Sequence, residues 1–183
     1  MMRLLVAGMG NVLRQDDGFG VEVARRLMAG HTLPAGVTVI EVGIGGIHLV
    51  QELMDGYDAL VVLDAVERGS VPGTVHLLAA DVPDLALWSD DERGDFLADM
   101  HYTTPSKAMI LARALDVLPP QVFILGCQPG EADEMGIGLT APVERAAAEA
   151  IRTLEELVGH LDREVGDERL AATAGPPSGI SDG

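Results

Sequence analysis

The segment Leu5–Leu27, LVAGMGNVLRQDDGFGVEVARRL, contains an apolar run, a glycine-containing turn and an amphipathic stretch. This order predicts a β-strand that leads through a tight turn into an α-helix. A turn that binds a dinucleotide would have a third glycine where Leu13 stands, and Asp16 and Asp17 would repel a pyrophosphate. We therefore expect this turn to bind no nucleotide, and its two carboxylates suit a cation.

Strand-like and helix-like segments alternate along the rest of the chain. Strands are expected at residues 3–7, 37–42, 59–66, 73–80 and 121–127, and helices at about 18–29, 47–54, 104–115 and 140–161. The acidic segment 88–100 is expected to be a surface loop with room for a short helix. This order predicts a single-domain α/β protein with an open, twisted, mostly parallel sheet and helices on both faces.

Length, charge and cysteine content narrow the class of protein. The chain has 183 residues, which suits one domain, and we expect that domain to span residues 1–163 with a disordered tail at 164–183. Its 12 basic and 29 acidic residues give a net charge of −17, which disfavours nucleic acid and anionic membranes as partners. No apolar run is long enough for membrane insertion, and no signal peptide is evident. The single cysteine, Cys127, suits a reducing cytoplasm.

Polar residues that follow the predicted strands are the candidates for chemistry, since ligands of such sheets gather at the carboxyl ends of the strands. Asp17 follows the first strand, Asp64 ends the central apolar run, and His101 precedes a predicted helix. Two carboxylates and an imidazole suit a divalent transition metal. Spacing alone is weak evidence, because an acidic chain offers many such triples. No G-x-S-x-G motif stands between a predicted strand and a predicted helix, and Cys127 has no histidine near it in sequence, so nucleophilic catalysis has no signature.

The motif GMGNVLRQDDGFGV at residues 8–21 resembles the opening motif of the hydrogenase maturation endopeptidases. These enzymes trim the C-terminus of the large subunit of [NiFe] hydrogenases once nickel is in place. Three later segments are similar to the same family, and the resemblance covers about residues 3–161. They are ALVVLDAVERGSVPGTVHLL at 59–78, HYTTPSKAMILAR at 101–113 and ILGCQPGEADEMGIGLTAPVERA at 124–146.

The resemblance implies a site made of Asp17, Asp64 and His101, which would serve as metal ligands and as the catalytic residues. Asp16 would then be a turn or capping residue. Nickel would arrive bound to cysteines of the partner, a hydrogenase large-subunit precursor, and no nucleotide would be needed. The chain departs from the family at position 17, where some members have Glu, at Ile44, which replaces Thr, and in the YTTP segment after His101. The last departure suggests a different hydrogenase partner.

Two mechanisms and two functions stay open at this point. Nickel could polarise the scissile carbonyl or lower the pKa of an attacking water. Alternatively, it could only anchor the substrate while Asp17 or Asp64 acts as general base. The leading function is a nickel-dependent endopeptidase, and the alternative is a nickel-binding chaperone or sensor that holds the precursor without cutting it.

Overall fold

The structure of the protein is a computed structural model, which describes residues 2–30, 33–98, 104–130, 132 and 134–173. Its last helix is described through Thr173, with side chains through Glu164. Among the described helices, none combines the length and the apolar character needed to cross a membrane.

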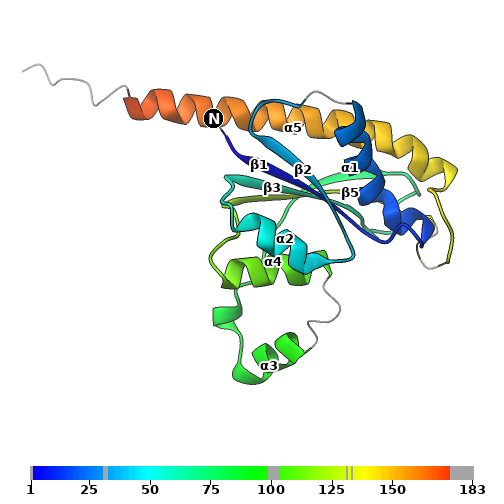
Figure 1. The fold of residues 1–183 in the computed structure, drawn as a ribbon, viewed down its shortest axis with the longest axis horizontal. Coiled ribbons are helices and arrows are strands. Elements are labelled where there is room, and N and C mark those ends of the chain that lie inside the picture. The colour runs from blue at the N-terminus through cyan, green and yellow to red at the C-terminus, as the bar shows by residue number, and fades with distance from the viewer. Residues whose placement is uncertain (1, 31–32, 99–103, 131, 133, 174–183) are drawn as a thin grey trace, which may run out of the picture.

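Five strands form one sheet in the order β2-β1-β3-β5-β4 (Figure 1). The strands are β1 (Leu4–Met9), β2 (Val37–Gly43), β3 (Ala59–Ala65), β4 (Val75–Ala79) and β5 (Gln121–Cys127). The first three and β5 are parallel, whereas β4 pairs antiparallel with β5. The connection between β3 and β4, residues 66–74, is too short for the crossover that a parallel strand needs. Strand β4 therefore begins at the end of the sheet where β3 ends, and it runs in the opposite direction. The prediction of a mostly parallel sheet is confirmed.

Helices cover both faces of the sheet, as predicted (Figure 1). One apolar core packs α1 (Phe19–Gly30) and α5 (Ala141–Thr173) against the sheet. A second core packs α2 (Gly46–Leu53) and α4 (Pro105–Ala114) against the opposite face. A short 3-10 helix, η1 (Gln15–Gly18), precedes α1, and a second one, η2 (Leu85–Leu87), precedes α3 (Asp90–Ala98). Helix α3 lies away from the sheet (Figure 1).

The acidic segment after Trp88 is mostly helical, where a surface loop with room for a short helix was expected. Ser89 and Glu92 form a capping box at its start. The Ser89 backbone N–H and hydroxyl donate to Glu92 Oε2 at 2.8 and 2.7 Å, and the Glu92 N–H donates to Ser89 Oγ at 3.3 Å. The serine followed three residues later by glutamate was a sequence signal for this helix, although its apolar pattern is weak.

The last helix continues to Thr173, past residue 163 where the sequence predicts the folded domain to end. The backbone of residues 164–173 is therefore helical, where the sequence predicts the start of a disordered tail. Acidic and basic residues such as Arg163 and Glu164 are compatible with helix, and the proline- and glycine-rich part begins only at Gly175. Residues 174–183 lie outside the described part, and the domain boundary itself stays a prediction.

Two glycines let α1 lie close to the central strands. A Cβ atom on Gly8 would lie 2.5 Å from the carbonyl oxygen of Gly20. A Cβ on Gly20 would lie 2.0 Å from the carbonyl oxygen of Leu63 and 2.5 Å from that of Met9. Backbone atoms cannot give way as a flexible side chain does, so both positions require glycine. This close approach places the start of α1 directly over β1 and β3.

We predict that Gly20→Ala lowers the free energy of unfolding by about 3 kcal/mol or more, because the added methyl meets two carbonyl oxygens. Gly30→Ala is the matched control at the other end of the same helix. A Cβ there meets no atom within 4 Å, so its stability should stay unchanged or rise by up to about 1 kcal/mol. Urea denaturation of both variants measures the difference, and equal stabilities would refute the close-packing account.

Candidate active site

The turn after β1 presents two adjacent carboxylates at the carboxyl end of the sheet. Gly10 has φ of 119°, and a Cβ there would lie 1.8 Å from the carbonyl oxygen of Asp17, so the turn requires glycine. The chain then forms η1, which contains Asp16 and Asp17. Successive side chains of a 3-10 helix point about 120° apart. The two aspartates therefore face different surroundings.

Asp16 is fully buried and joins this turn to the segment after β5. Its Oδ2 accepts from the Gly130 N–H at 2.9 Å and from the Thr140 hydroxyl at 2.8 Å, and its Oδ1 accepts from the Thr140 N–H at 2.7 Å. Thr140 stands immediately before α5. Asp16 thus has a structural role, as the resemblance implies. Its bonds, however, reach across the fold to another helix instead of capping its own.

Asp17 and Asp64 line the same cavity, which has a volume of about 400 Å³. Asp17 Oδ2 accepts from the Asn11 N–H at 3.0 Å, which fixes one side of this carboxylate. Asp64 lies on β3 next to its final residue, and a Cβ on Gly10 would come within 3.7 Å of Asp64 Oδ1. The absence of a side chain at Gly10 therefore leaves the space beside this oxygen open. The structure brings two of the three predicted site residues together.

The Asp64 carboxyl has a strongly perturbed acidity. Burial raises its pKa from an ordinary value of 3.8 to about 7, the N–H of Ala65 opposes this rise, and the negative charge of Asp17 adds to it. At neutral pH both the acid and the carboxylate are populated. Such a group can exchange a proton near neutrality, and a cation in the cavity would favour its ionised form.

His101 lies outside the described residues, so its place relative to the two carboxylates stays a prediction. The described chain resumes at Thr104, which lines the same cavity together with Pro105. Thr104 also caps α4, because its Oγ accepts from the Lys107 N–H at 3.3 Å. Within the described residues, no group of three His, Cys, Asp or Glu side chains could hold a metal ion.

Cys127 is excluded as a nucleophile at neutral pH by its surroundings. Its side chain is fully buried, and burial followed by the charge of Asp16 raises the pKa of the thiol to about 12. Cys127 therefore acts as a small buried apolar residue.

Gln128 is a buried residue that sequence reasoning missed. It is 3% exposed, and its Oε1 accepts from the N–H groups of Arg68 and Ser70 at 2.8 and 3.1 Å. Its Nε2 donates to Glu67 Oε1 at 2.6 Å. These bonds fix the turn between β3 and β4. A glutamine after a strand gives no sequence signal of such a role.

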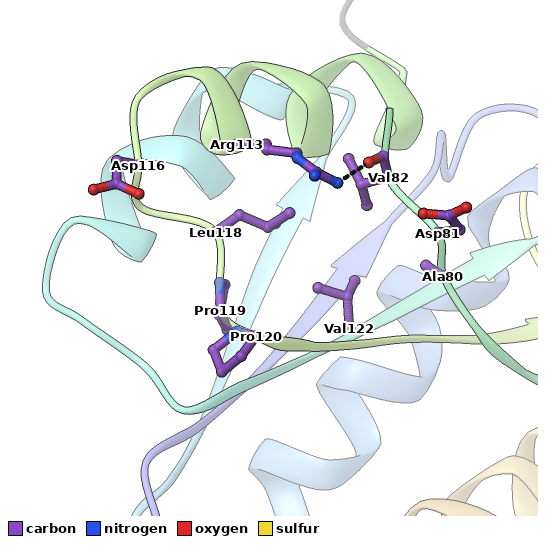
Figure 2. Close-up of a pocket in the computed structure, with 9 residues that line it drawn as sticks. All are labelled: Ala80, Asp81, Val82, Arg113, Asp116, Leu118, Pro119, Pro120 and Val122. Atoms are coloured by element: carbon purple, nitrogen blue, oxygen red, sulfur yellow. Dashed lines mark hydrogen bonds between the residues drawn. The ribbon is translucent and has the colours of Figure 1, made fainter. Parts of the chain in front are cut away.

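A second cavity, of about 360 Å³, lies at the opposite end of the parallel strands (Figure 2). Pro119 and Pro120, which precede β5, line it together with Arg113 from α4. Figure 2 shows the Arg113 guanidinium reaching the Val82 carbonyl, to which it donates a hydrogen bond, and it also lies 3.9 Å from Asp84. Because Arg113 is occupied in these contacts and the acidic pair lies at the other end, we do not assign the active site here.

Substitution of each aspartate separates the structural role from the functional one. Asp16→Asn should lower the free energy of unfolding by roughly 2–4 kcal/mol, because an amide nitrogen would face a backbone or hydroxyl donor in a buried site. Asp17→Asn should change stability by less than about 0.5 kcal/mol, since its amide oxygen can still accept from Asn11. Urea denaturation at pH 7 tests both. The assignment is wrong if Asp17→Asn is the more damaging change.

The raised pKa of Asp64 predicts a stability difference that depends on pH. Between about pH 4 and 7 the unfolded chain loses the Asp64 proton while the folded protein keeps it, so stability falls as pH rises through this range. The gap between the two pKa values corresponds to at most about 4 kcal/mol. Asp64→Asn should therefore unfold at a higher urea concentration than the wild type at pH 8, and at a similar concentration at pH 4. A variant that is less stable at pH 8 would contradict this.

Comparison with known proteins identifies the family of the chain. Residues 21–157 match the family model described as hydrogenase maturation protease, HycI. The hydrogenase expression/formation protein HupD of Rhodobacter capsulatus is 34% identical over 160 residues, which cover 83% of this chain and 71% of that protein. The coenzyme F420 hydrogenase subunit delta of Methanothermobacter thermautotrophicus is 32% identical over 163 residues, with 85% and 94% covered.

Solved structures of hydrogenase maturation peptidases have the same fold. The hydrogenase 2 maturation peptidase from a Thaumarchaeota archaeon is 31% identical, with a TM-score of 0.64 over 86% of this chain and 98% of that one. The hydrogenase maturating endopeptidase HybD from E. coli is 25% identical, with a TM-score of 0.68 over 87% and 93%. The family match contains Asp64 and His101, and Asp17 lies just before it. The chain belongs to the hydrogenase maturation protease family.

Proposed function

We propose that this protein is a nickel-dependent endopeptidase that removes the C-terminal extension of a [NiFe] hydrogenase large-subunit precursor. The observation that carries the proposal is the pair of carboxylates, Asp17 and Asp64, that line one cavity at the carboxyl ends of the strands. In a member of this family, a cavity lined by two carboxylates suits the recognition of a substrate segment that carries a metal ion.

Nickel is expected to enter the site as part of the substrate. Carboxylate oxygens and a neutral imidazole are suitable ligands for Ni²⁺, and Asp17, Asp64 and His101 would supply them. Burial, and to a smaller extent the negative charge of Asp17, raise the pKa of Asp64, and a cation between the two carboxylates would favour its ionised form. Ligands from separate strand ends hold free metal less tightly than ligands fixed on one helix. We therefore infer that the protein alone retains little metal.

The carboxylates differ in what they can contribute to cleavage. A cation in the cavity would keep Asp64 ionised, so that its carboxylate can accept a proton from an attacking water. Asp17, whose Oδ2 is held by Asn11, suits a fixed ligand of the metal. Nickel would polarise the scissile carbonyl or only position it, and the general-base role of Asp64 is compatible with both routes.

The decisive experiment incubates the protein with large-subunit precursor that has been loaded with nickel, and measures the C-terminal mass of the precursor. We expect the extension to be removed from nickel-loaded precursor and retained on nickel-free precursor, even with the protein in excess. Equal cleavage of both forms would refute the substrate-borne metal. Stable binding without cleavage would instead support a chaperone or sensor.

Variants of the three site residues complete this experiment. Asp17→Asn, Asp64→Asn and His101→Ala should each lower the processing rate at least about 100-fold, because each removes a ligand or the proton acceptor. Asp95→Asn is the matched control, since this carboxylate is exposed on α3 and lines no part of the cavity. Normal processing by two of the three site variants would show that the proposed site is wrong.

A further inference from the structure

Four exposed apolar side chains lie on the loops around the active-site cavity. Their exposed fractions are 51% for Leu13, 71% for Ile44, 76% for Met135 and 89% for Ile137. We call these four residues the apolar rim. Single exposed apolar residues are common on protein surfaces, but several large ones on adjoining loops are typical of a surface that binds another molecule.

Backbone hydrogen bonds hold the three loops of the apolar rim together. The Gly10 N–H donates to the Gly43 carbonyl at 3.1 Å, which ties the turn after β1 to the turn that contains Ile44. The Gly136 N–H donates to the Leu13 carbonyl at 2.9 Å, and the Gln15 N–H donates to the Gly136 carbonyl at 3.0 Å. Leu13, Met135 and Ile137 are therefore presented on two loops that pair directly with each other.

The backbone at this pairing is strained and closely packed. Gln15 has φ of 46°, a left-handed conformation that non-glycine residues seldom adopt. A Cβ on Gly136 would lie 2.6 Å from the Cγ of Gln15, so the two loops pack closely against each other here. Strain of this kind persists only where the surroundings impose it, and it is common at binding sites. The rim is thus fixed in place before any partner binds.

The apolar rim borders cavities on both sides of the turn at residues 10–18. Ile44 lines the active-site cavity beside Asp17 and Asp64. Ile137 lines a third cavity, of about 190 Å³, together with Val12 and Leu139. The apolar rim therefore extends from the active-site cavity to the cavity on the other side of this turn.

We propose that the apolar rim docks the hydrogenase large-subunit precursor through apolar side chains that flank its cleavage site. This inference rests on the proposed function, because it takes the substrate of the acidic cavity as the occupant. Ile44 joins the apolar rim to the cavity that contains Asp17 and Asp64, so a substrate segment bound at the acidic pair lies beside the rim. The rim then supplies affinity, and the cavity supplies the chemistry.

Charge substitution on the apolar rim tests the docking. Ile44→Asp and Ile137→Asp should each raise the Kd for immobilised nickel-loaded precursor at least about tenfold, because a carboxylate in an apolar contact loses its hydration. In cleavage assays Ile137→Asp should raise KM to a similar extent, while its kcat changes less than about twofold, because Ile137 lines no part of the active-site cavity. Ile44→Leu should bind as the wild type does.

Leu87→Asp is the matched control, since Leu87 is 86% exposed and lies on η2, away from the cavity. It should bind and process the precursor as the wild type does, and thermal midpoints verify that all variants are folded. The docking inference is overturned if the Ile44 and Ile137 variants bind as tightly as Leu87→Asp, or if the wild type does not bind precursor. Rim-dependent binding without any change in the C-terminal mass would support the docking and overturn the endopeptidase.

Discussion

The buried carboxylate of Asp16 is the interaction on which the arrangement of the site depends. It accepts hydrogen bonds from Gly130 and Thr140, which lie more than a hundred residues further along the chain. These bonds hold the first strand-to-helix turn against the segment between β5 and α5. Because a 3-10 helix has three residues per turn, adjacent side chains of η1 point in different directions. Asp16 points into the protein, and Asp17 lines the cavity that Asp64 also lines.

The site keeps two acidic groups close together at a cost in stability. Burial and the charge of Asp17 make ionisation of Asp64 unfavourable, and the half-buried Arg14 is the one basic residue among the described residues that line this cavity. A polar arrangement that is unfavourable in the isolated protein is common where a ligand completes it. The left-handed backbone of Gln15, at the nearby loop pairing, is also unfavourable in the isolated protein and is a feature common at binding sites.

Several features of the fold and site could be read from particular residues. The continuous apolar runs of β1 and β3 predicted a buried parallel pair, and the residues that follow such strands predicted Asp17 and Asp64 at one edge of the sheet. The Ser89–Glu92 spacing carried a helix signal that the weak apolar pattern of α3 obscured. The antiparallel direction of β4 was implied by the short connection that precedes it.

The sequence by itself determined the order of strands and helices, the need for glycine in the first turn and the family, because these depend on local spacing and residue type. Local pattern left Asp16 and Asp17 chemically equivalent, and the resemblance to the family assigned the site to Asp17 and a turn or capping role to Asp16. Only the tertiary structure supplies the physical reason, because hydrogen-bond donors of Gly130 and Thr140 bury one carboxylate and leave the other at the cavity. The raised pKa of Asp64 and the convergence of the apolar rim were likewise decided by distant segments, whose contacts no local pattern encodes.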